Sequence, residues 1–395
     1  MMFHINKHHT RNNMKKVALS MILATTMLCS CLSGCSKGTS EGASDEIKIG
    51  VIAPLTGNYA EHGKSFEVAM SMAVEEINEA GGINGRKLEL TFNDTEGDNK
   101  KAADLASMYA EDESYVAMLG GFTSGCAMAA APICDESGIV LLSPTASNAA
   151  YAQMSKYCFS IPNISTLEAP IMVKKAVAGY CGAKSVYVFA LNSDWGMGAL
   201  EGFKAGAEEA GVEILGVETY VAGETDYSAM ITKAAAANPE MIVILDTQVA
   251  TVLNQIRTAG LTTKVANYGS SASNEVITLC GENAEGLVAS AEILDTSKEE
   301  NKAFAENFKE RAGFDPSLYA GYAYTTAYIM ADAIERCGEN VTREAIRDEI
   351  AKTDGTYLYG GVTFNENGNR VIDPENASYE VFEVQNGEWV RVQQK

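Results

Sequence analysis

Residues that could perform covalent chemistry are few in this chain. Its 395 residues contain four histidines, and all but His62 fall within the first nine positions. A Ser-His-Asp or Cys-His nucleophile system would depend on His62 alone, and the sequence holds no Gly-x-Ser-x-Gly elbow. No His and Cys residues have the spacing of a zinc site. The sequence therefore favours a binding protein that has no catalytic step, no cofactor and no metal ion.

Hydroxyl and amide groups gather instead in three loops that follow predicted strands, at residues 120–125, 143–148 and 192–196. Ser124 is expected to cap the helix that begins there. The N-terminus of a helix offers free N–H donors and a positive dipole to a carboxylate. The residues alone leave an alternative open, in which Ser124 only caps its helix and Thr145 and Ser147 shape a turn around a proline.

Short apolar runs alternate with amphipathic segments from Ile47 onward, a pattern typical of parallel strands joined by helices. The first series has strands at 47–55, 88–93, 116–119 and 139–142, with helices at 63–80, 100–111 and 124–136. A second series has strands at 185–190, 212–220, 241–245 and 264–267, with helices at 196–210, 227–237 and 250–259. The last part predicts helices at 299–311, 319–336 and 342–352, then strands at 362–364, 379–384 and 389–392. Two similar α/β halves follow, with ligands expected at the carboxyl ends of the strands.

The start of the chain resembles an export signal. Lys15-Lys16 precedes an apolar stretch at 17–32 that is too short to span a bilayer, and Leu32-Ser-Gly-Cys35 is similar to a bacterial lipobox. This resemblance implies cleavage before Cys35 and a lipid on its sulfur. A buried amphipathic helix, or a signal cut elsewhere, is the alternative. We therefore expect an extracytoplasmic protein that its lipid holds to the membrane. Residues 1–34 would be a signal peptide with an upstream extension, and residues 35–45 a lipid-anchored linker.

Composition narrows the remaining part of the chain. About 360 residues follow Cys35, which favours two domains over one. The leader holds four of the 30 Lys and Arg residues, so 26 remain against 52 Asp and Glu, and nucleic acid is not an expected partner. Six cysteines lie beyond Cys35, and in a chain this large they are expected to be small buried hydrophobes: Cys126, Cys134, Cys158, Cys181, Cys280 and Cys337.

Five stretches, in this order and spacing, resemble the branched-chain amino-acid binding proteins, the type I periplasmic-binding-protein group that serves ABC transporters. They are Ile49-Gly-Val-Ile-Ala-Pro-Leu-Thr-Gly57, Glu76-Ile-Asn-Glu-Ala-Gly-Gly-Ile-Asn-Gly-Arg86, residues 124–147, Asp194-Trp-Gly-Met-Gly198 and Thr225-Asp-Tyr-Ser228. The resemblance implies an α/β fold of two doubly wound, Rossmann-like lobes, joined by crossing hinge strands and closing on a small molecule. Lobe 1 would comprise 46–162 and 293–365, and lobe 2 would comprise 163–292 and 366–395.

The resemblance also implies partners. We expect a monomer that captures a small carboxylate ligand, first of all a branched-chain amino acid, and delivers it to ABC permease subunits. Two rivals stay open. One is a ligand-sensing module for amides or other small molecules, without transport. The other is a surface α/β enzyme, against which the near absence of histidine counts.

The resemblance assigns candidate ligand contacts residue by residue. Ser124 falls where the family holds the ligand carboxylate with a serine. Thr145, Ala146 and Ser147 fall where a backbone amide and a hydroxyl complete that grip. Trp195 matches an aromatic residue of the second lobe that closes over the ligand, with a domain-surface filler as the alternative.

Further aromatic residues are candidate walls of the same site. His62 occupies a position that is aromatic in some relatives, and a solvated loop histidine is the alternative. Tyr59 and Tyr319 are also candidates, although a tyrosine at helical spacing can equally belong to the core.

One position departs from the family pattern. Relatives that take amino acids place an acidic residue for the ligand ammonium where this chain has Gly269. An ammonium removed from water without a counter-charge is costly. Either Asp246, next to Thr247, substitutes for that acid, or the ligand carries no ammonium. Asp246 as a plain helix N-cap remains the alternative.

Overall fold

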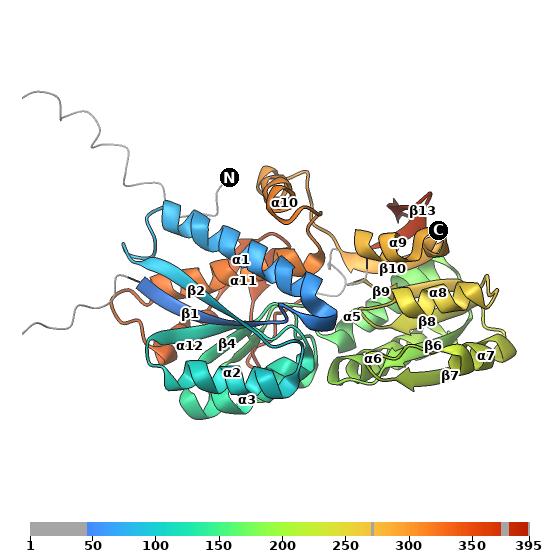
Figure 1. The fold of residues 1–395 in the computed structure, drawn as a ribbon, viewed down its shortest axis with the longest axis horizontal. Coiled ribbons are helices and arrows are strands. Elements are labelled where there is room, and N and C mark those ends of the chain that lie inside the picture. Colours follow the sequence, from blue (N-terminus) through green and yellow to red (C-terminus); the bar gives the residue numbers. More distant parts are fainter. Residues whose placement is uncertain (1–45, 270–271, 373–378, 394–395) are drawn as a thin grey trace, which may run out of the picture. The chain divides into compact units, whose positions relative to one another are not determined.

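The structure is a computed structural model that describes residues 46–269, 272–372 and 379–393 (Figure 1). The predicted signal peptide, Cys35 and the linker lie outside these residues. Within the described ranges, no helix combines the length and the apolar character needed to cross a bilayer.

Five parallel strands form the sheet of the first lobe, in the order β2-β1-β3-β4-β5. Helices α1 (Ala60–Glu79) and α11 (Leu318–Arg336) pack together on one face of this sheet, and α2 (Asn99–Glu111) and α3 (Ser124–Ser137) pack together on the other (Figure 1). Strand β1 is almost fully buried, as expected where helices cover both faces of a parallel sheet. The strands are β1 Glu46–Ala53, β2 Lys87–Asp94, β3 Tyr115–Gly120, β4 Val140–Ser143 and β5 Cys158–Ser160.

Shorter elements complete the first lobe. The 3₁₀ turn η1 (Gly57–Tyr59) leads into α1, and α4 (Ala149–Gln153) lies between β4 and β5. Helix α10 (Glu299–Ala312) packs on α1, while α12 (Arg343–Ala351) packs on α11, β3 and β4. A separate hairpin, β11 (Asp354–Tyr357) and β12 (Gly360–Thr363), follows α12.

Seven strands form the sheet of the second lobe, in the order β14-β13-β10-β9-β8-β6-β7. Strands β6 to β10 run parallel, and the hairpin β13–β14 adds to β10 in the antiparallel sense. These strands are β6 Ser185–Leu191, β7 Glu213–Tyr220, β8 Met241–Leu245, β9 Lys264–Tyr268, β10 Leu287–Glu292, β13 Tyr379–Gln385 and β14 Glu388–Val392.

Two hydrophobic cores cover the faces of this second sheet. One packs α5 (Ser165–Met172), its π-helical continuation η2 (Val173–Tyr180) and α6 (Asp194–Ala210) against the strands. The other packs α7 (Ser228–Ala237), α8 (Ala250–Thr258), α9 (Asn274–Cys280) and the turn η4 (Gly281–Ala284). Because both faces are filled, ligand access is left to the edge where the strands end.

The predicted α/β fold with two doubly wound lobes is confirmed, and each long predicted element is present. The sequence pattern did not predict several short elements, namely β5, β10, α4, α5 with η2, α9 and strand β11. Strand β5 has only three residues, and β10 (Leu-Val-Ala-Ser-Ala-Glu) is rich in small side chains with weak strand preference.

The chain passes between the lobes three times: after β5, after β10 and before β13. Isolated bridges still hold Asn369 beside Ser160 and Arg370 beside Phe364. We therefore place the third crossing after Arg370, a few residues later than the family resemblance alone suggests.

A buried polar cluster ties these crossing segments together. Glu292 forms an ion pair with Arg370 at 3.3 Å, and both side chains are about 5% exposed. Glu168 on α5 accepts hydrogen bonds from the hydroxyls of Tyr268 and Tyr379. Burial raises the pKa of Glu168 to about 8, and the nearby charge of Glu292 adds to the rise. Glu168 is therefore protonated at neutral pH, because Arg370 neutralises only Glu292.

Candidate functional site

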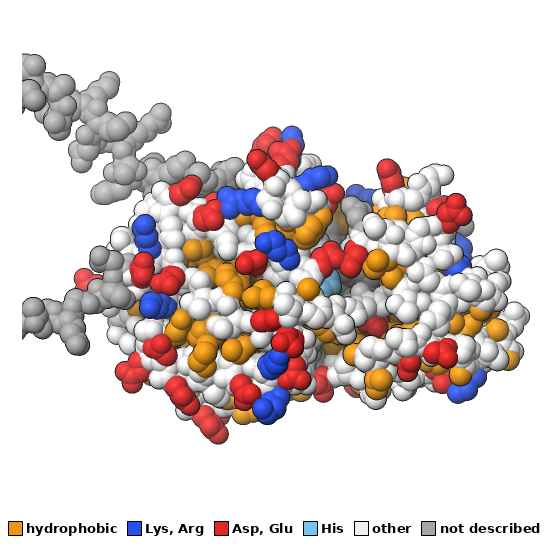
Figure 2. Space-filling model, viewed as in Figure 1, with side chains coloured by type: hydrophobic (Ala, Val, Ile, Leu, Met, Phe, Trp, Pro, Cys, Tyr) orange, Lys and Arg blue, Asp and Glu red, His pale blue; other side chains and the backbone are white. Residues whose placement is uncertain are grey.

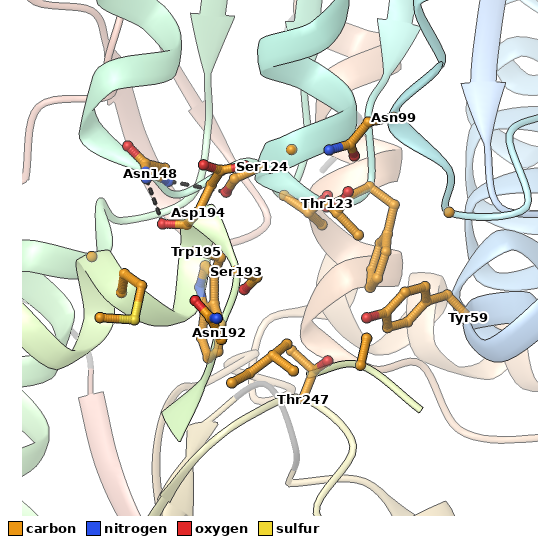
Figure 3. Close-up of a pocket in the computed structure, with 18 of the residues that line it drawn as sticks. Tyr59, Asn99, Thr123, Ser124, Asn148, Asn192, Ser193, Asp194, Trp195 and Thr247 are labelled. Atoms are coloured by element: carbon orange, nitrogen blue, oxygen red, sulfur yellow. Dashed lines mark hydrogen bonds between the residues drawn. The ribbon is translucent and has the colours of Figure 1, made fainter. Parts of the chain in front are cut away.

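A cavity of about 1060 Å³ lies where the strands of the two sheets end. Its walls come from the loops after β1, β2, β3 and β4 in the first lobe and after β6 and β8 in the second (Figure 3). The lining residues include three carboxylates and no Lys, Arg or His. Figure 2 shows further acidic side chains spread over the viewed face of the molecule. The cavity therefore lies in an electrically negative environment.

The start of α3 differs from the expectation for Ser124. Thr123 is the N-cap residue, and its Oγ1 accepts a hydrogen bond from Cys126 N at 3.0 Å. Ser124 is the first helical residue, and its Oγ accepts a bond from Asn148 N at 3.2 Å. The prediction that Ser124 is the cap was wrong, because the hydroxyl one position earlier has the extended backbone that a cap needs. The Ser124 hydroxyl hydrogen thus remains able to donate into the cavity that Ser124 lines.

The loop after β4 is held by its own hydroxyl groups. Ser143 Oγ accepts bonds from the backbone N–H groups of Thr145 and Ala146, at 3.3 and 2.9 Å. Thr145 Oγ1 donates to Phe122 O at 2.8 Å, which fixes this loop against the start of α3. Thr145 lines the cavity. Ala146 and Ser147 are buried outside the lining, and Ser147 O accepts a bond from Ser165 N.

The second lobe supplies the N-terminus of α6. Ser193 caps this helix by accepting a bond from Gly196 N at 3.0 Å, and Asp194 and Trp195 form its first turn. The Trp195 ring contacts Tyr268 edge to face, with centroids 5.0 Å apart. This contact fixes the indole on the cavity wall (Figure 3).

Two side-chain amides bridge the lobes across the cavity. Asn148 Nδ2 donates to Asp194 O at 2.6 Å, a bond drawn in Figure 3. Gln248 Nε2 donates to Asn58 O. Asn148 also donates its backbone N–H to Ser124 Oγ, so one residue links the candidate carboxylate site to the second lobe.

A pair of carboxyl groups also meets between the lobes. Glu61 on α1 forms a side-chain hydrogen bond with Glu275 on α9. Burial raises the pKa of Glu61 to about 7, and the bond and charge of Glu275 add to the rise. The contact with Glu275 therefore ties the protonation of Glu61 on the first lobe to a residue of the second lobe.

Aromatic rings form the wall of the cavity at the first lobe. Phe122 contacts Tyr59, His62 and Tyr319, with ring centroids 5.2, 4.7 and 5.3 Å apart. Tyr59, Phe122 and Tyr319 line the cavity, whereas His62 packs behind them. Burial lowers the pKa of His62 to about 4, so its ring is neutral. His62 lies on α1 and not in a loop, and its half-buried ring stacks on Phe122 within this aromatic cluster.

Gly269 has no room for a side chain. A Cβ atom there would lie 2.1 Å from Ser290 O on the neighbouring strand. An acidic residue at this position would therefore collide with the backbone of β10. Gly269 lies outside the residues that line the cavity.

Asp246 follows β8 directly and is 4% exposed. Its carboxylate accepts bonds from Tyr220 OH at 2.7 Å and Gln248 N at 3.0 Å. Burial raises its pKa. The helix-cap alternative was wrong, because α8 begins four residues later, at Ala250, with Val249 in the cap position. The next residue, Thr247, lines the cavity, whereas Asp246 does not.

The structure thus brings six of the predicted residues to one cavity: Tyr59, Ser124, Thr145, Trp195, Thr247 and Tyr319. Five others lie outside the described lining: His62, Ala146, Ser147, Asp246 and Gly269. The residue predictions missed other lining side chains, among them Asn99, Asn148, Asn192 and Asp194. Three of these belong to loops that the sequence had indicated, but a loop does not reveal which of its side chains turn inward.

Comparison with known proteins agrees with this architecture. The model of the periplasmic binding protein family matches residues 46–388. The chain is 25% identical over 345 residues to a Leu/Ile/Val-binding protein homolog 1 of Brucella suis, covering 87% of this chain and 91% of that one. It is 26% identical over 346 residues to a leucine-, isoleucine-, valine-, threonine- and alanine-binding protein of Pseudomonas aeruginosa, covering 86% and 90%.

Solved structures give the same result for the fold. A leucine-binding protein of Thermotoga maritima superposes with a TM-score of 0.78 at 27% identity, covering 88% of this chain and 98% of that one. A branched-chain amino-acid transporter binding protein of Streptococcus pneumoniae, solved with isoleucine, gives 0.78 at 25% identity, covering 88% and 100%. The chain therefore belongs to the periplasmic binding protein family, as an extracytoplasmic solute-binding protein of the branched-chain amino-acid ABC transporter type.

Proposed function

We propose that this protein captures a small carboxylate-bearing molecule, with a branched-chain amino acid as the first candidate, by closing its two lobes, and delivers it to ABC permease subunits. A lipid on Cys35 would hold the mature, monomeric protein at the membrane. The observation that carries the proposal is the cavity between the lobes, to which Ser124 and Thr145 contribute from one side and Trp195 and Thr247 from the other.

The carboxylate would bind at the first lobe. The N-terminus of α3 lines the cavity together with the Ser124 hydroxyl, whose oxygen already accepts from Asn148 N. The hydroxyl hydrogen and the helix N–H groups can therefore point at an anion, and the helix dipole favours it. The Thr145 amide is the second donor in reach, since its bond to Ser143 Oγ is long at 3.3 Å.

The apolar part of the ligand would lie among aromatic rings. Tyr59, Phe122 and Tyr319 form one wall, and Trp195 and Leu191 contribute from the second lobe. These rings supply large apolar contact area in a site that closure would shield from water. Names of relatives in Brucella suis and Pseudomonas aeruginosa, which refer to leucine, isoleucine and valine, support this choice.

The ammonium group of such a ligand needs a counter-charge that Gly269 does not provide. We assign this role to the buried carboxylate of Asp246, which directly precedes the lining residue Thr247 in the chain. Burial raises the pKa of Tyr59 on the first lobe to about 12, and the charge of Asp246 adds to the rise, which places Asp246 within electrostatic reach of the opposite wall. A ligand cation between these residues would offset the burial of the Asp246 charge.

Isothermal titration calorimetry with leucine, isoleucine and valine tests the proposal. Replacement of Ser124 by alanine removes one charge-assisted hydrogen bond, worth about 1.5 to 3 kcal/mol, and should weaken binding by about tenfold to a hundredfold. Ser137→Ala is the matched control, because this serine lies at the other end of α3, where its Oγ donates to Ile133 O. Equal affinities of Ser124→Ala and wild type would remove Ser124 from the site.

A further inference from the structure

Two thiols meet in the first lobe. Cys134, in the last turn of α3, is fully buried, and Cys158, the first residue of β5, is 1% exposed. Both are free thiols in the structure, and they lie close enough to influence each other. This contact and the burial raise the pKa of the Cys134 thiol well above its ordinary value.

The backbone around both cysteines is fixed by separate contacts. Ser155 Oγ, shortly before β5, donates to Asp135 Oδ1 at 3.0 Å, next to Cys134. Cys158 pairs with Leu141 in the parallel ladder of β4 and β5. Tyr151 OH donates to Leu141 O at 2.8 Å and closes the cluster from the side of α4. The thiols therefore face each other because the helix end and the strand are both held in place.

Other cysteines use different partners. The Cys126 thiol, two turns earlier on α3, is hydrogen-bonded to Thr123. Cys280 and Cys337 donate to the backbone oxygens of Ala250 and Ala333, at 3.8 and 3.3 Å. The Cys134–Cys158 contact thus stands apart from the pattern of isolated, hydrophobic cysteines that the sequence predicts.

We propose that Cys134 and Cys158 form a disulfide bond in the exported protein. The oxidant would be a disulfide-bearing thiol oxidoreductase or a small disulfide. One cysteine thiolate attacks a sulfur of that disulfide and releases one thiolate. The second cysteine then attacks the mixed disulfide and expels the other, so the protein loses two electrons and two protons and the oxidant becomes a dithiol.

The location of the protein favours this step. Cys158 belongs to the wall of a second cavity of about 440 Å³, but both cysteine side chains are at most 1% exposed, so the reagent would react with them during folding or local opening. Extracytoplasmic compartments allow structural disulfides to form and persist.

The bond would close a loop that contains part of the ligand cavity. The segment between the two cysteines includes β4 and the following residues 143–148, of which Thr145 and Asn148 line the cavity. A covalent link at its two ends restricts the unfolded chain and holds this loop in place. Oxidation would thus stabilise the carboxylate side of the cleft.

Peptide mapping of the exported full-length protein tests the proposal. The protein is alkylated in acid without reductant and digested with trypsin, which leaves Cys134 in residues 102–156 and Cys158 in residues 157–174. We expect these two peptides to be joined, and to separate after reduction. Because Cys126 lies in the same peptide, Cys126→Ala is the control that must keep the link, whereas Cys134→Ala must lose it.

Thermal unfolding gives a second readout. Reduction should lower the Tm of the wild type by about 5 °C and leave the Tm of Cys134→Ala unchanged. Separate, alkylated peptides in the exported protein, even after treatment with oxidised glutathione, would overturn the proposal. A link that survives in Cys134→Ala would overturn it as well. Neither readout depends on the ligand, so the result is independent of the proposed transport function.

Discussion

Replacing Glu168 by glutamine should make the protein more stable at neutral and alkaline pH. Glu168 lies at the first crossing between the lobes, where the hydroxyls of Tyr268 and Tyr379 surround its carboxyl group and burial raises its pKa to about 8. Charged groups near this cluster include Glu292, its partner Arg370, and Lys175, whose Nζ donates to Tyr379 O at 2.6 Å. Glutamine has nearly the same shape but cannot ionise, so it removes the proton linkage and keeps the packing.

The sign and size follow from this raised pKa. Between pH 4.5, the ordinary value, and pH 8, the unfolded chain releases the Glu168 proton while the folded chain retains it. The native state then binds more protons, so stability falls as pH rises, by about 1.4 kcal/mol for each pH unit. From pH 5 to pH 8 this group should lower the free energy of unfolding by about 3 kcal/mol, a loss that Glu168→Gln would not undergo.

Urea unfolding without ligand, at pH 5, 6, 7 and 8, measures the effect. The difference in free energy of unfolding between Glu168→Gln and wild type should grow by about 3 kcal/mol over this range. Glu208→Gln, an exposed substitution on α6, is the control and should show a nearly constant difference. A constant difference for Glu168→Gln as well would mean that Glu168 is ionised in the folded protein. It would refute the conclusion that the folded protein keeps the Glu168 proton up to about pH 8.

Three further predictions concern the cleft. Calorimetry should show that Asp246→Asn reduces the preference for leucine over 4-methylpentanoate, the leucine analogue without the amino group, by about tenfold. An unchanged preference would exclude Asp246 as the counter-charge. Asn148→Ala should weaken ligand binding by about fivefold, because it loses the bond to Asp194 O. At sub-saturating ligand concentration, small-angle scattering should show a more open average shape for this variant than for the wild type. Affinity should fall about threefold from pH 6 to pH 8 as Glu61, whose pKa is raised to about 7 by burial and by its contact with Glu275, loses its proton; Glu61→Gln, which cannot ionise there, should bind equally at both pH values.

Sequence patterns predicted the fold well because long strands and helices carry strong periodicity. They failed where a segment owes its structure to its neighbours. Strand β10 is formed between β9 and β13, and its own sequence, Leu-Val-Ala-Ser-Ala-Glu, has little strand preference. Helix α5 begins without a side-chain cap, so the usual start signal is missing.

In the candidate site, too, the sequence predicted some features correctly and missed those that depend on neighbouring segments. The loops that follow the strands were predicted correctly, since chain order and strand direction decide where they lie. Contacts between the lobes were not predicted, because they join residues far apart in the chain; the Asn148 bond to Asp194 O joins residues 46 positions apart. The cap of α3 was displaced by one residue for a local reason: Thr123 and Ser124 both have a suitable hydroxyl, and only the backbone angles of the folded chain decide between them.

The backbone around Gly269 leaves no room for the acidic residue that the family resemblance leads one to expect there. With Ser290 O 2.1 Å from the place of a Cβ atom, an acidic residue could not be restored at 269 without moving β10 away from β9. A change of ligand charge preference in this protein must therefore involve other strand ends, and β8 is the adjacent one in the sheet. Asp246 at its end is already buried and hydrogen-bonded, so its carboxylate is fixed in position before any ligand arrives. A fixed carboxylate does not have to reorganise when an ammonium approaches, so the role proposed for Asp246 predicts a preference for amino acids over simple carboxylates in a cleft whose described lining contains no cationic side chain.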